Sequence, residues 1–337
     1  MSKHVLVTGG AGYLGAILVP KLLARGHRVT VYDCLLFGEA PLRAVRSAPG
    51  LTVIRGDIRD HDHVDRVLAE GHFDSVIHLA AISNDPSSEL DPELTHGVNL
   101  LGTEHLMRSA KDAGVARFLY ASSASVYGIK ETADVTEELE LEPITLYARY
   151  KSDGEQILWG LLDEDFCGVA VRAATVCGWS PRLRLDLTIN ILTSHALTRG
   201  AIRVFGGSQM RPNIHIEDLT DFYAFLLDAP REAIQGQAFN ISAENASVMA
   251  LAEMIRAEID PALPIDVEPT DDIRSYHLSA GKVRERLGFA PKRSLRQAVA
   301  DLRAAFADGR VPEVGDPIYR NVAWMKQHPD FWRGGDA

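Results

Sequence analysis

Hydrophobic and polar positions follow two periods in the first half of the chain. Short apolar runs of strand length lie at 4–10, 27–33, 51–57, 74–81 and 116–123, and all but the fourth end in glycine, serine or aspartate. Between them lie longer stretches with apolar residues at helical spacing, at 13–26, 62–71 and 95–114. Strands that alternate with helices form βαβ units, and these units build a parallel sheet covered by helices on both faces.

The alternation fades after about residue 175, where prolines, arginines and short mixed elements follow. We therefore predict an α/β fold, a Rossmann-like doubly wound parallel sheet with a smaller mixed α/β substrate-binding lobe. The sheet domain is expected over 1–175, the lobe over 176–320 and a C-terminal tail over 321–337. A strand near 236–242 is expected to return to the first domain.

Composition narrows the classes of function. Apolar residues make up 46% of the 337, enough for a substantial core, but no apolar run approaches the length of about eighteen residues that a membrane helix needs. The formal net charge of −11 argues against nucleic acid as a partner. The cysteines, Cys34, Cys167 and Cys177, suggest neither a metal site nor a disulfide framework, and His195 has no metal-binding context. With a start unlike a signal peptide, this predicts a cytoplasmic protein without metal.

A glycine turn follows the first strand. Residues 8–15 read TGGAGYLG, and an amphipathic helix comes directly after them. In this context Gly9 permits the tight turn, Gly12 lets the backbone approach a pyrophosphate, and Gly15 lets the helix pack on the strand. The helix N-terminus adds amide donors for the phosphates. The turn therefore predicts a dinucleotide site.

An aspartate at the end of the second strand favours NAD as the dinucleotide. Asp33 ends the second strand, where a carboxylate accepts hydrogen bonds from both ribose hydroxyls of NAD and repels the 2′-phosphate of NADP. The residues that follow, CLLFGEA, include no arginine or lysine. Asp57, after the third strand, is placed either to meet the adenine amino group or to form a turn.

Tyr147 and Lys151 stand four residues apart, on one face of a predicted helix. A neighbouring ammonium stabilises a phenolate and lowers the pKa of the tyrosine, which lets it exchange a proton with a substrate hydroxyl near neutral pH. Serines follow the strand at 116–123, about 25 residues upstream, where a hydroxyl can bind the same oxygen. We expect the glycine turn, the serines and the tyrosine–lysine pair to lie together at the carboxyl edge of one sheet. This combination indicates hydride exchange between a substrate carbon and nicotinamide.

The motifs TGGAGYLG, GDIRD, HLAA, NLLGT, SSASVYG and YARYK occur in this order over about residues 3 to 300. In order and spacing the chain resembles the extended short-chain dehydrogenase/reductases, and among them the NAD-dependent nucleotide-sugar epimerases and dehydratases. The resemblance implies a homodimer and gives Ser123, Tyr147 and Lys151 the catalytic positions. Lys151 would also hold the nicotinamide ribose, and Tyr147 would contact the cofactor as well. The further cofactor contacts expected are Tyr13, Leu14, Ile58, Leu79, Ala80, Ala81 and Asn99.

The resemblance also implies that the second lobe binds a nucleotide-diphosphate sugar. Arg211 and Arg274 take the positions of arginines that hold the pyrophosphate, and arginine suits this role because guanidinium binds phosphate oxygens in pairs. A surface ion pair is the other interpretation for each. Arg182 and Arg184 would contact phosphate or sugar, or pair with Asp186. The remaining expected substrate contacts are Ser83, Ser125, Thr175 and Asn190.

The sequence departs from the family pattern at the sugar-facing positions. Dehydratases carry Asp-Glu after the catalytic serine or threonine, whereas this chain has Ala124 and Ser125, which argues against 4,6-dehydration. A related group of 3,5-epimerases has a cysteine where Ser125 stands. Thr175 replaces a usual asparagine, and Cys177 follows in place of a tyrosine. Cys177 is either an acid or base near the sugar or a small buried filler.

These observations predict an NAD-dependent nucleotide-sugar epimerase that forms a transient keto-sugar. A net 4-dehydrogenase or keto-sugar reductase would use the same serine, tyrosine and lysine, so cofactor stoichiometry separates these alternatives. A non-catalytic nucleotide sensor is the third alternative, although a sensor would not need all three residues together.

Overall fold

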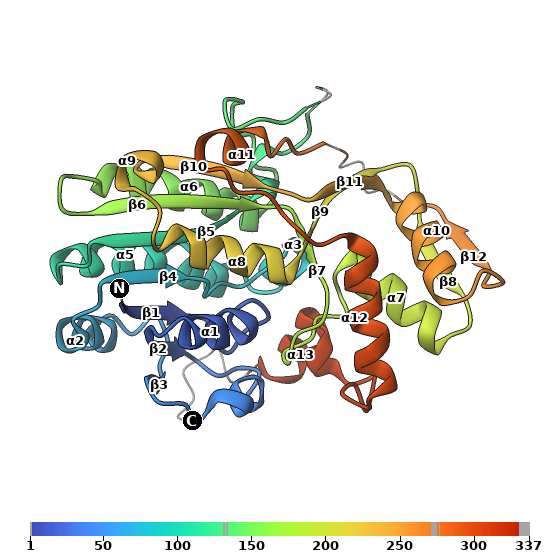
Figure 1. Ribbon diagram of the computed structural model, residues 1–337, viewed down its shortest axis with the longest axis horizontal. Coiled ribbons are helices and arrows are strands. Elements are labelled where there is room, and N and C mark those ends of the chain that lie inside the picture. Colours follow the sequence, from blue (N-terminus) through green and yellow to red (C-terminus); the bar gives the residue numbers. More distant parts are fainter. Residues whose placement is uncertain (1, 131, 133, 271–274, 276, 330–337) are drawn as a thin grey trace.

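A computed structural model describes residues 2–130, 132, 134–270, 275 and 277–329. Its centre is a sheet of seven parallel strands in the order β10-β6-β5-β4-β1-β2-β3 (Figure 1). The strands are β1 (His4–Thr8), β2 (Arg28–Asp33), β3 (Leu51–Arg55), β4 (Ser75–His78), β5 (Arg117–Ser123), β6 (Cys167–Ala173) and β10 (Gln237–Ile241). The predicted α/β fold with a Rossmann-like sheet is confirmed.

Helices cover both faces of this sheet because its strands are apolar on both sides. In β1, Val5 and Val7 belong to one buried cluster, and Leu6 belongs to another on the opposite face. The first cluster packs under α1 (Gly15–Ala24) and α8 (Ile216–Leu226). The second packs under α2 (His61–Gly71), α5 (Thr103–Asp112) and α6 (Leu146–Leu161).

Short elements connect the longer strands and helices. They are η1 (Ala40–Val45), α3 (Asp85–Ser88), α4 (Pro92–His96), η2 (Gly97–Gly102), η3 (Ala124–Tyr127), α9 (Arg231–Ile234), α11 (Gly281–Leu287) and η4 (Pro317–Tyr319). Side-chain caps mark the start of some of these segments. Asn84 and Asp91, for example, accept hydrogen bonds from Ser87 N and Leu94 N and so cap α3 and α4.

The smaller lobe has two sheets of its own. One has the order β11-β9-β7, with β11 (Glu244–Ser247), β9 (Met210–His215) and β7 (Thr175–Cys177), and the other pairs β12 (Ile265–Glu268) with β8 (Ile202–Phe205). A separate buried cluster joins these strands to α7 (Thr188–Thr198), α10 (Val248–Ile259) and α12 (Leu295–Ala307). The lobe lies beside the carboxyl ends of the central strands (Figure 1).

The last described helix, α13 (Asn321–Gln327), packs back onto the body near α3 and η4. Within the described part of the chain, no helix is both long and apolar enough to cross a membrane. The domain boundaries given above stay a prediction.

Candidate active site

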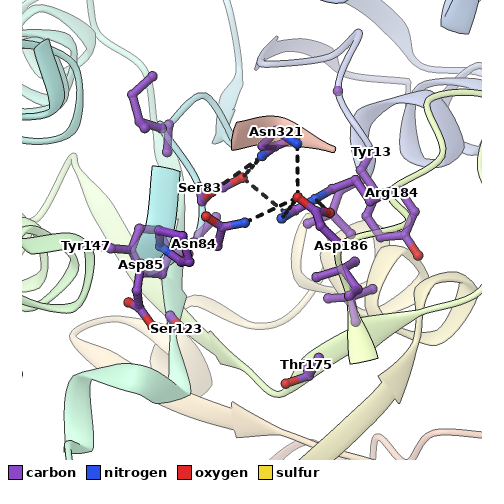
Figure 2. A pocket seen from close by; sticks show the side chains of 18 of the residues that line it. Tyr13, Ser83, Asn84, Asp85, Ser123, Tyr147, Thr175, Arg184, Asp186 and Asn321 are labelled. Atoms are coloured by element: carbon purple, nitrogen blue, oxygen red, sulfur yellow. Dashed lines mark hydrogen bonds and ion pairs between the residues drawn. The ribbon is translucent and has the colours of Figure 1, made fainter. Parts of the chain in front are cut away.

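A cavity of about 1020 Å³ opens at the carboxyl edge of the central sheet and runs between the two lobes. Its wall includes the glycine turn, the ends of β2, β4 and β5, the start of α6, and parts of β7, β9 and α13. Figure 2 shows side chains from both lobes around it. The sequence-predicted residues that line it are Gly9, Gly12, Tyr13, Leu14, Asp33, Asp57, Ile58, Leu79, Ala80, Ala81, Ser83, Ser123, Ser125, Tyr147, Lys151, Thr175, Arg182 and Arg211.

The glycine turn packs so tightly against neighbouring backbone that side chains do not fit at two of its positions. Gly9 has a φ of +70°, and a Cβ on it would lie 2.6 Å from the backbone nitrogen of Ala80. A Cβ on Gly15 would lie 2.4 Å from the carbonyl oxygen of Gly10. Gly15 therefore keeps α1 close to the turn, and the start of the helix faces the cavity as a dinucleotide pyrophosphate requires.

Asp33 locks the end of β2 to this turn. Its two carboxylate oxygens accept hydrogen bonds from Ala11 N (2.9 Å) and Leu35 N (2.7 Å). Burial raises the pKa of the carboxyl, while the two backbone bonds lower it. The anion is therefore fixed at the cavity wall, where ribose hydroxyls can donate to it.

Asp57 lines the cavity but also has a close partner in the protein. Arg59 donates to it from the backbone nitrogen (2.9 Å) and from the guanidinium, with Nη2 2.6 Å from Oδ2. Ile58, the residue between them in the chain, is only 5% exposed and belongs to the second core cluster. Both interpretations of Asp57, adenine contact and turn former, fit this geometry.

Asn99 holds the loop after β4, which lines the cavity. It is buried, with its Oδ1 accepting from Ile82 N (2.8 Å) and its Nδ2 donating to Ile82 O (2.9 Å). These bonds fix the loop whose residues Leu79, Ala80 and Ala81 line the cavity. Asn99 itself is not among the lining residues.

The candidate catalytic hydroxyls come from two elements. Ser123 ends β5, and its Oγ accepts hydrogen bonds from Ser125 Oγ (2.9 Å) and Ser125 N (3.2 Å). Tyr147 lies in the first turn of α6, which Thr145 caps by accepting from Ala148 N (3.2 Å). Thr145 in turn donates to Asp85 (2.6 Å), so α3 helps to place the tyrosine.

Lys151 follows one turn later on α6 and is only 4% exposed. Its Nζ lies 5.8 Å from the ring centroid of Tyr147 and 4.9 Å from that of Tyr120, which places the ammonium against both aromatic faces. Burial lowers the pKa of Lys151 to about 7, and the charge of Glu155 opposes this change. The predicted tyrosine–lysine arrangement is therefore present in the structure.

The substrate residues predicted in the second lobe do not all face the cavity. Thr175 on β7 and Arg211 on β9 line it. Asn190 is fully buried in α7: its Oδ1 accepts from Gly178 N (2.9 Å), and its Nδ2 donates to Arg184 O (2.8 Å) and Tyr13 Oη (3.1 Å). Arg274 lies outside the described residues.

Arg184 and Asp186 form the centre of a polar cluster at the cavity wall (Figure 2). Arg184 Nε lies 2.9 Å from Asp186 Oδ1, and its Nη1 donates to Ser83 Oγ (3.2 Å). Of the two predicted alternatives for the neighbouring arginines, it is Arg184 that makes the ion pair with Asp186.

Arg182 has a different environment. Its guanidinium is nearly buried, stacks 3.6 Å from the ring centroid of Phe37 and donates to Asn321 Oδ1 (2.5 Å). Burial lowers its pKa to about 9, and the charge of Arg184 adds to this. Because Arg184 makes the ion pair with Asp186 and Arg182 lines the cavity, the other predicted alternative for Arg182 is a contact with phosphate or sugar.

The C-terminal region also contributes to the cavity, which the sequence pattern did not indicate. Asn321, at the start of α13, donates from its side chain to Ser83 Oγ (3.1 Å) and from its backbone to Asp186 (3.0 Å). Trp324 donates to Leu36 O (2.9 Å), next to Phe37. The aromatic residues of the tail were the available signal, but a sequence pattern does not show which distant loop they contact.

Cys177 is fully buried, and its thiol donates to Ile214 O (3.4 Å) instead of lining the cavity. Burial raises the pKa of the thiol well above its ordinary value. Of the two interpretations above, the geometry supports the buried filler.

We therefore expect Cys177→Ala to leave kcat and KM unchanged and to lower the free energy of unfolding by about 1 kcal/mol, because a small buried side chain is removed. Steady-state kinetics and urea denaturation of the two proteins measure this. A loss of kcat with normal stability would instead make Cys177 a chemical participant.

Among the described residues, no group of three or more histidines, cysteines or carboxylates is arranged to hold a metal ion. The cavity instead brings together a hydroxyl, a phenol and an ammonium beside a turn suited to a dinucleotide. That combination can move a proton to and from a substrate hydroxyl while a nicotinamide lies alongside.

Comparison with known proteins agrees with this geometry. The family model for the NAD-dependent epimerase/dehydratase family matches residues 5–242. The UDP-glucose 4-epimerase of Lactobacillus helveticus is 29% identical, with 96% of this chain and 98% of the relative aligned. The enzyme of the same name from Mycolicibacterium smegmatis is 31% identical over 88% of this chain and 96% of its own length.

Solved structures share the whole architecture. The Thermus thermophilus UDP-glucose 4-epimerase in complex with NAD is 26% identical and superposes with a TM-score of 0.78, over 90% of this chain and 99% of that one. The dTDP-glucose 4,6-dehydratase of Streptomyces venezuelae, solved with NAD bound, is also 26% identical, with a TM-score of 0.77 and 98% of each chain covered. The likeness thus includes enzymes of two reaction types.

Proposed function

Because this chain belongs to the NAD-dependent epimerase/dehydratase family, we propose that it inverts the C4 hydroxyl of a UDP-sugar, in the manner of a UDP-glucose 4-epimerase. NAD-dependent nucleotide-sugar epimerisation is the activity that the family and the relatives support. The uridine base, the sugar and the C4 position are the proposed refinements.

One observation carries the proposal: Ser123, Tyr147 and Lys151 line the same cavity as the glycine turn and Asp33. The residues around the turn fit a dinucleotide, since Gly9 and Gly15 exclude side chains and Asp33 offers a fixed carboxylate. The turn and Asp33 would hold NAD, which supplies a reversible acceptor for hydride when bound.

The chain's own residues then handle the sugar. Ser123 binds the C4 oxygen, and Tyr147 takes its proton as the sugar is oxidised to the ketone. Lys151 stabilises the phenolate. Tyr147 returns the proton after the ketone has presented its other face, so each group ends the cycle in its starting state.

The diphosphate would lie toward the second lobe. We propose Arg211 as its guanidinium partner, with Arg182 at the cavity wall and the hydroxyls of Ser83, Ser125 and Thr175 toward the sugar. We also propose, from the sequence alone, that Arg274 binds the diphosphate. Asn190 would support this wall from behind, since its amide bonds hold Gly178 and Tyr13.

The residues after Ser123 favour epimerisation over dehydration. Ala124 is buried and has no acid, and Ser125 presents a hydroxyl that already bonds to Ser123. Loss of water from the sugar requires an acid to protonate the departing hydroxyl. The observed pair supplies none, in line with the expectation from sequence.

Incubation with UDP-galactose, UDP-glucose and their uronic acid and N-acetyl counterparts, each with catalytic NAD, tests the proposal. We expect one C4 pair to interconvert without accumulation of free NADH. Stoichiometric NADH with an oxidised sugar would contradict the epimerase and favour the net dehydrogenase.

We further propose that the protein is a cytoplasmic homodimer, paired through helices that include α6, as the resemblance implies. Light scattering of the purified protein measures the oligomeric state. A monomer at assay concentration would contradict this part of the proposal and leave the chemistry untouched.

A further inference from the structure

Glu155 and Arg172 form a buried ion pair close to the catalytic residues. Glu155 follows Lys151 by one helical turn on the same face of α6 and is 0% exposed. Arg172 on β6 binds both of its carboxylate oxygens, with Nε 2.9 Å from Oε1 and Nη2 2.6 Å from Oε2. A buried carboxylate at this depth is costly unless it is paired.

The pair is tied to the elements that carry the catalytic groups. Ser122, next to Ser123 on β5, donates to Glu155. Arg172 donates to Tyr127 Oη (2.8 Å), and Tyr127 donates to Asn240 Oδ1 (2.7 Å). The network therefore joins α6, β5, β6 and β10 directly below the site.

The groups that face Lys151 from other elements are neutral. Tyr120 from β5 presents its ring, and burial raises the pKa of its phenol. His78 from β4 is held between Thr8 (2.7 Å) and Thr103 (3.0 Å), and burial together with Lys151 lowers its pKa to about 3. Glu155 is the anion that acts on Lys151.

The carboxylate of Glu155 therefore interacts with two cations, Arg172 and Lys151. Arg172 takes the hydrogen bonds of Glu155, while Lys151 receives its field across one helical turn. The ring of Tyr147 lies 5.8 Å from the Lys151 Nζ. Tyr223 of α8 acts on Tyr147 and is neutral, because burial raises the pKa of its phenol. The charge of Glu155 therefore acts on Lys151, and the charge of Lys151 acts on Tyr147.

We propose that Glu155 is a positioning residue for the reaction: held by Arg172, it keeps the Lys151 ammonium charged beside Tyr147. The proposal rests on the function proposed above, since it concerns the same tyrosine. Removing the carboxylate lets Lys151 lose its proton more easily, which leaves the Tyr147 phenolate less stable. The reaction requires the phenolate, so kcat falls at low pH where the phenolate is protonated. This acid limb of the kcat–pH profile then moves to higher pH.

The test compares Glu155→Gln with Tyr127→Phe in the full-length protein. Glutamine keeps the shape but removes the charge, whereas Tyr127→Phe breaks bonds to Arg172 and Asn240 in the same network and leaves the carboxylate in place. We expect Glu155→Gln to move the acid limb of the kcat–pH profile upward by about one pH unit. Tyr127→Phe should lose stability without moving the limb.

A purely structural role gives the opposite pattern. If both variants lose stability and activity equally, with the acid limb where it is in the wild type, the proposal is wrong. Should Glu155→Gln not fold, Glu155→Asp keeps a carboxylate farther from Lys151, and it must move the limb in the same direction by a smaller amount. An unmoved limb in that variant also overturns the proposal.

A second readout separates this inference from the proposed function. The ultraviolet absorbance of tyrosinate, taken as the difference between each protein and its Tyr147→Phe counterpart, titrates the phenol without turnover. We expect the titration to move upward in Glu155→Gln even if no tested sugar reacts. An unmoved titration contradicts the role of Glu155, and absent turnover contradicts the proposed function.

Discussion

Replacing Tyr147 with phenylalanine is expected to lower kcat by about 10³-fold, the contribution typical of a positioned acid–base group. The ring that stands 5.8 Å from Lys151 Nζ stays in place, and only the phenolic oxygen is lost. Binding of NAD should be unchanged, because the glycine turn and Asp33 are remote from that oxygen. Stopped assays of sugar interconversion and calorimetric titration with NAD measure the two quantities.

The matched control is Tyr150→Phe. Tyr150 lies on the same helix and is a competing phenol in the sequence, but it is not among the cavity-lining residues. It should retain kcat. If Tyr147→Phe keeps normal turnover, or if Tyr150→Phe loses it, the assignment of the proton-transfer group fails.

Replacing Asp33 with asparagine should weaken the binding of NAD by about 30-fold, corresponding to about 2 kcal/mol for hydrogen bonds to a charged acceptor. The carboxylate accepts from Ala11 N and Leu35 N with its two oxygens, and an amide offers only one acceptor. Its NH₂ group would face a backbone donor, so the glycine turn also loses its anchor.

The change should bring NAD and NADP closer together in affinity, because the negative charge that repels the 2′-phosphate is gone. Titration with both dinucleotides measures this. Equal preference for the two in the wild type, or an unchanged preference for NAD in Asp33→Asn, would contradict the assignment of the ribose contact.

The sequence predicted the parts of the site that local pattern determines. The glycine turn, Asp33 and the Tyr147–Lys151 spacing depend on a single strand end or a single helical turn, and the structure places each in the cavity. Parallel strands align their carboxyl ends, so Ser123 could be placed with them before the contacts were known.

Contacts between distant segments were not predictable in this way. The stacking of Arg182 on Phe37 and the bonds of Asn321 to Ser83 join parts of the chain that no periodicity relates. Asn190 shows the same limit, since its position near the cavity was expected but its inward amide bonds depend on Tyr13.

Glu155 is a residue whose role is partly visible in the sequence. A glutamate four residues after the lysine, on the buried face of a helix, needs a cationic partner. Arg172, in an otherwise apolar strand run, has the same need. The two patterns could have been paired, but only the structure shows which strand lies against α6.

The central claim is that one bound NAD oxidises the sugar and reduces it again within this site. The most direct measurement uses a UDP-sugar of the reactive pair deuterated at C4, incubated with the protein and excess unlabelled NADH. We expect the deuterium to remain at C4 of the inverted product. Release of the deuterium from the protein as deuterated NADH, formed when NAD accepts it from C4, with protium at C4 of the product, would contradict the claim and describe an enzyme that releases its reduced cofactor.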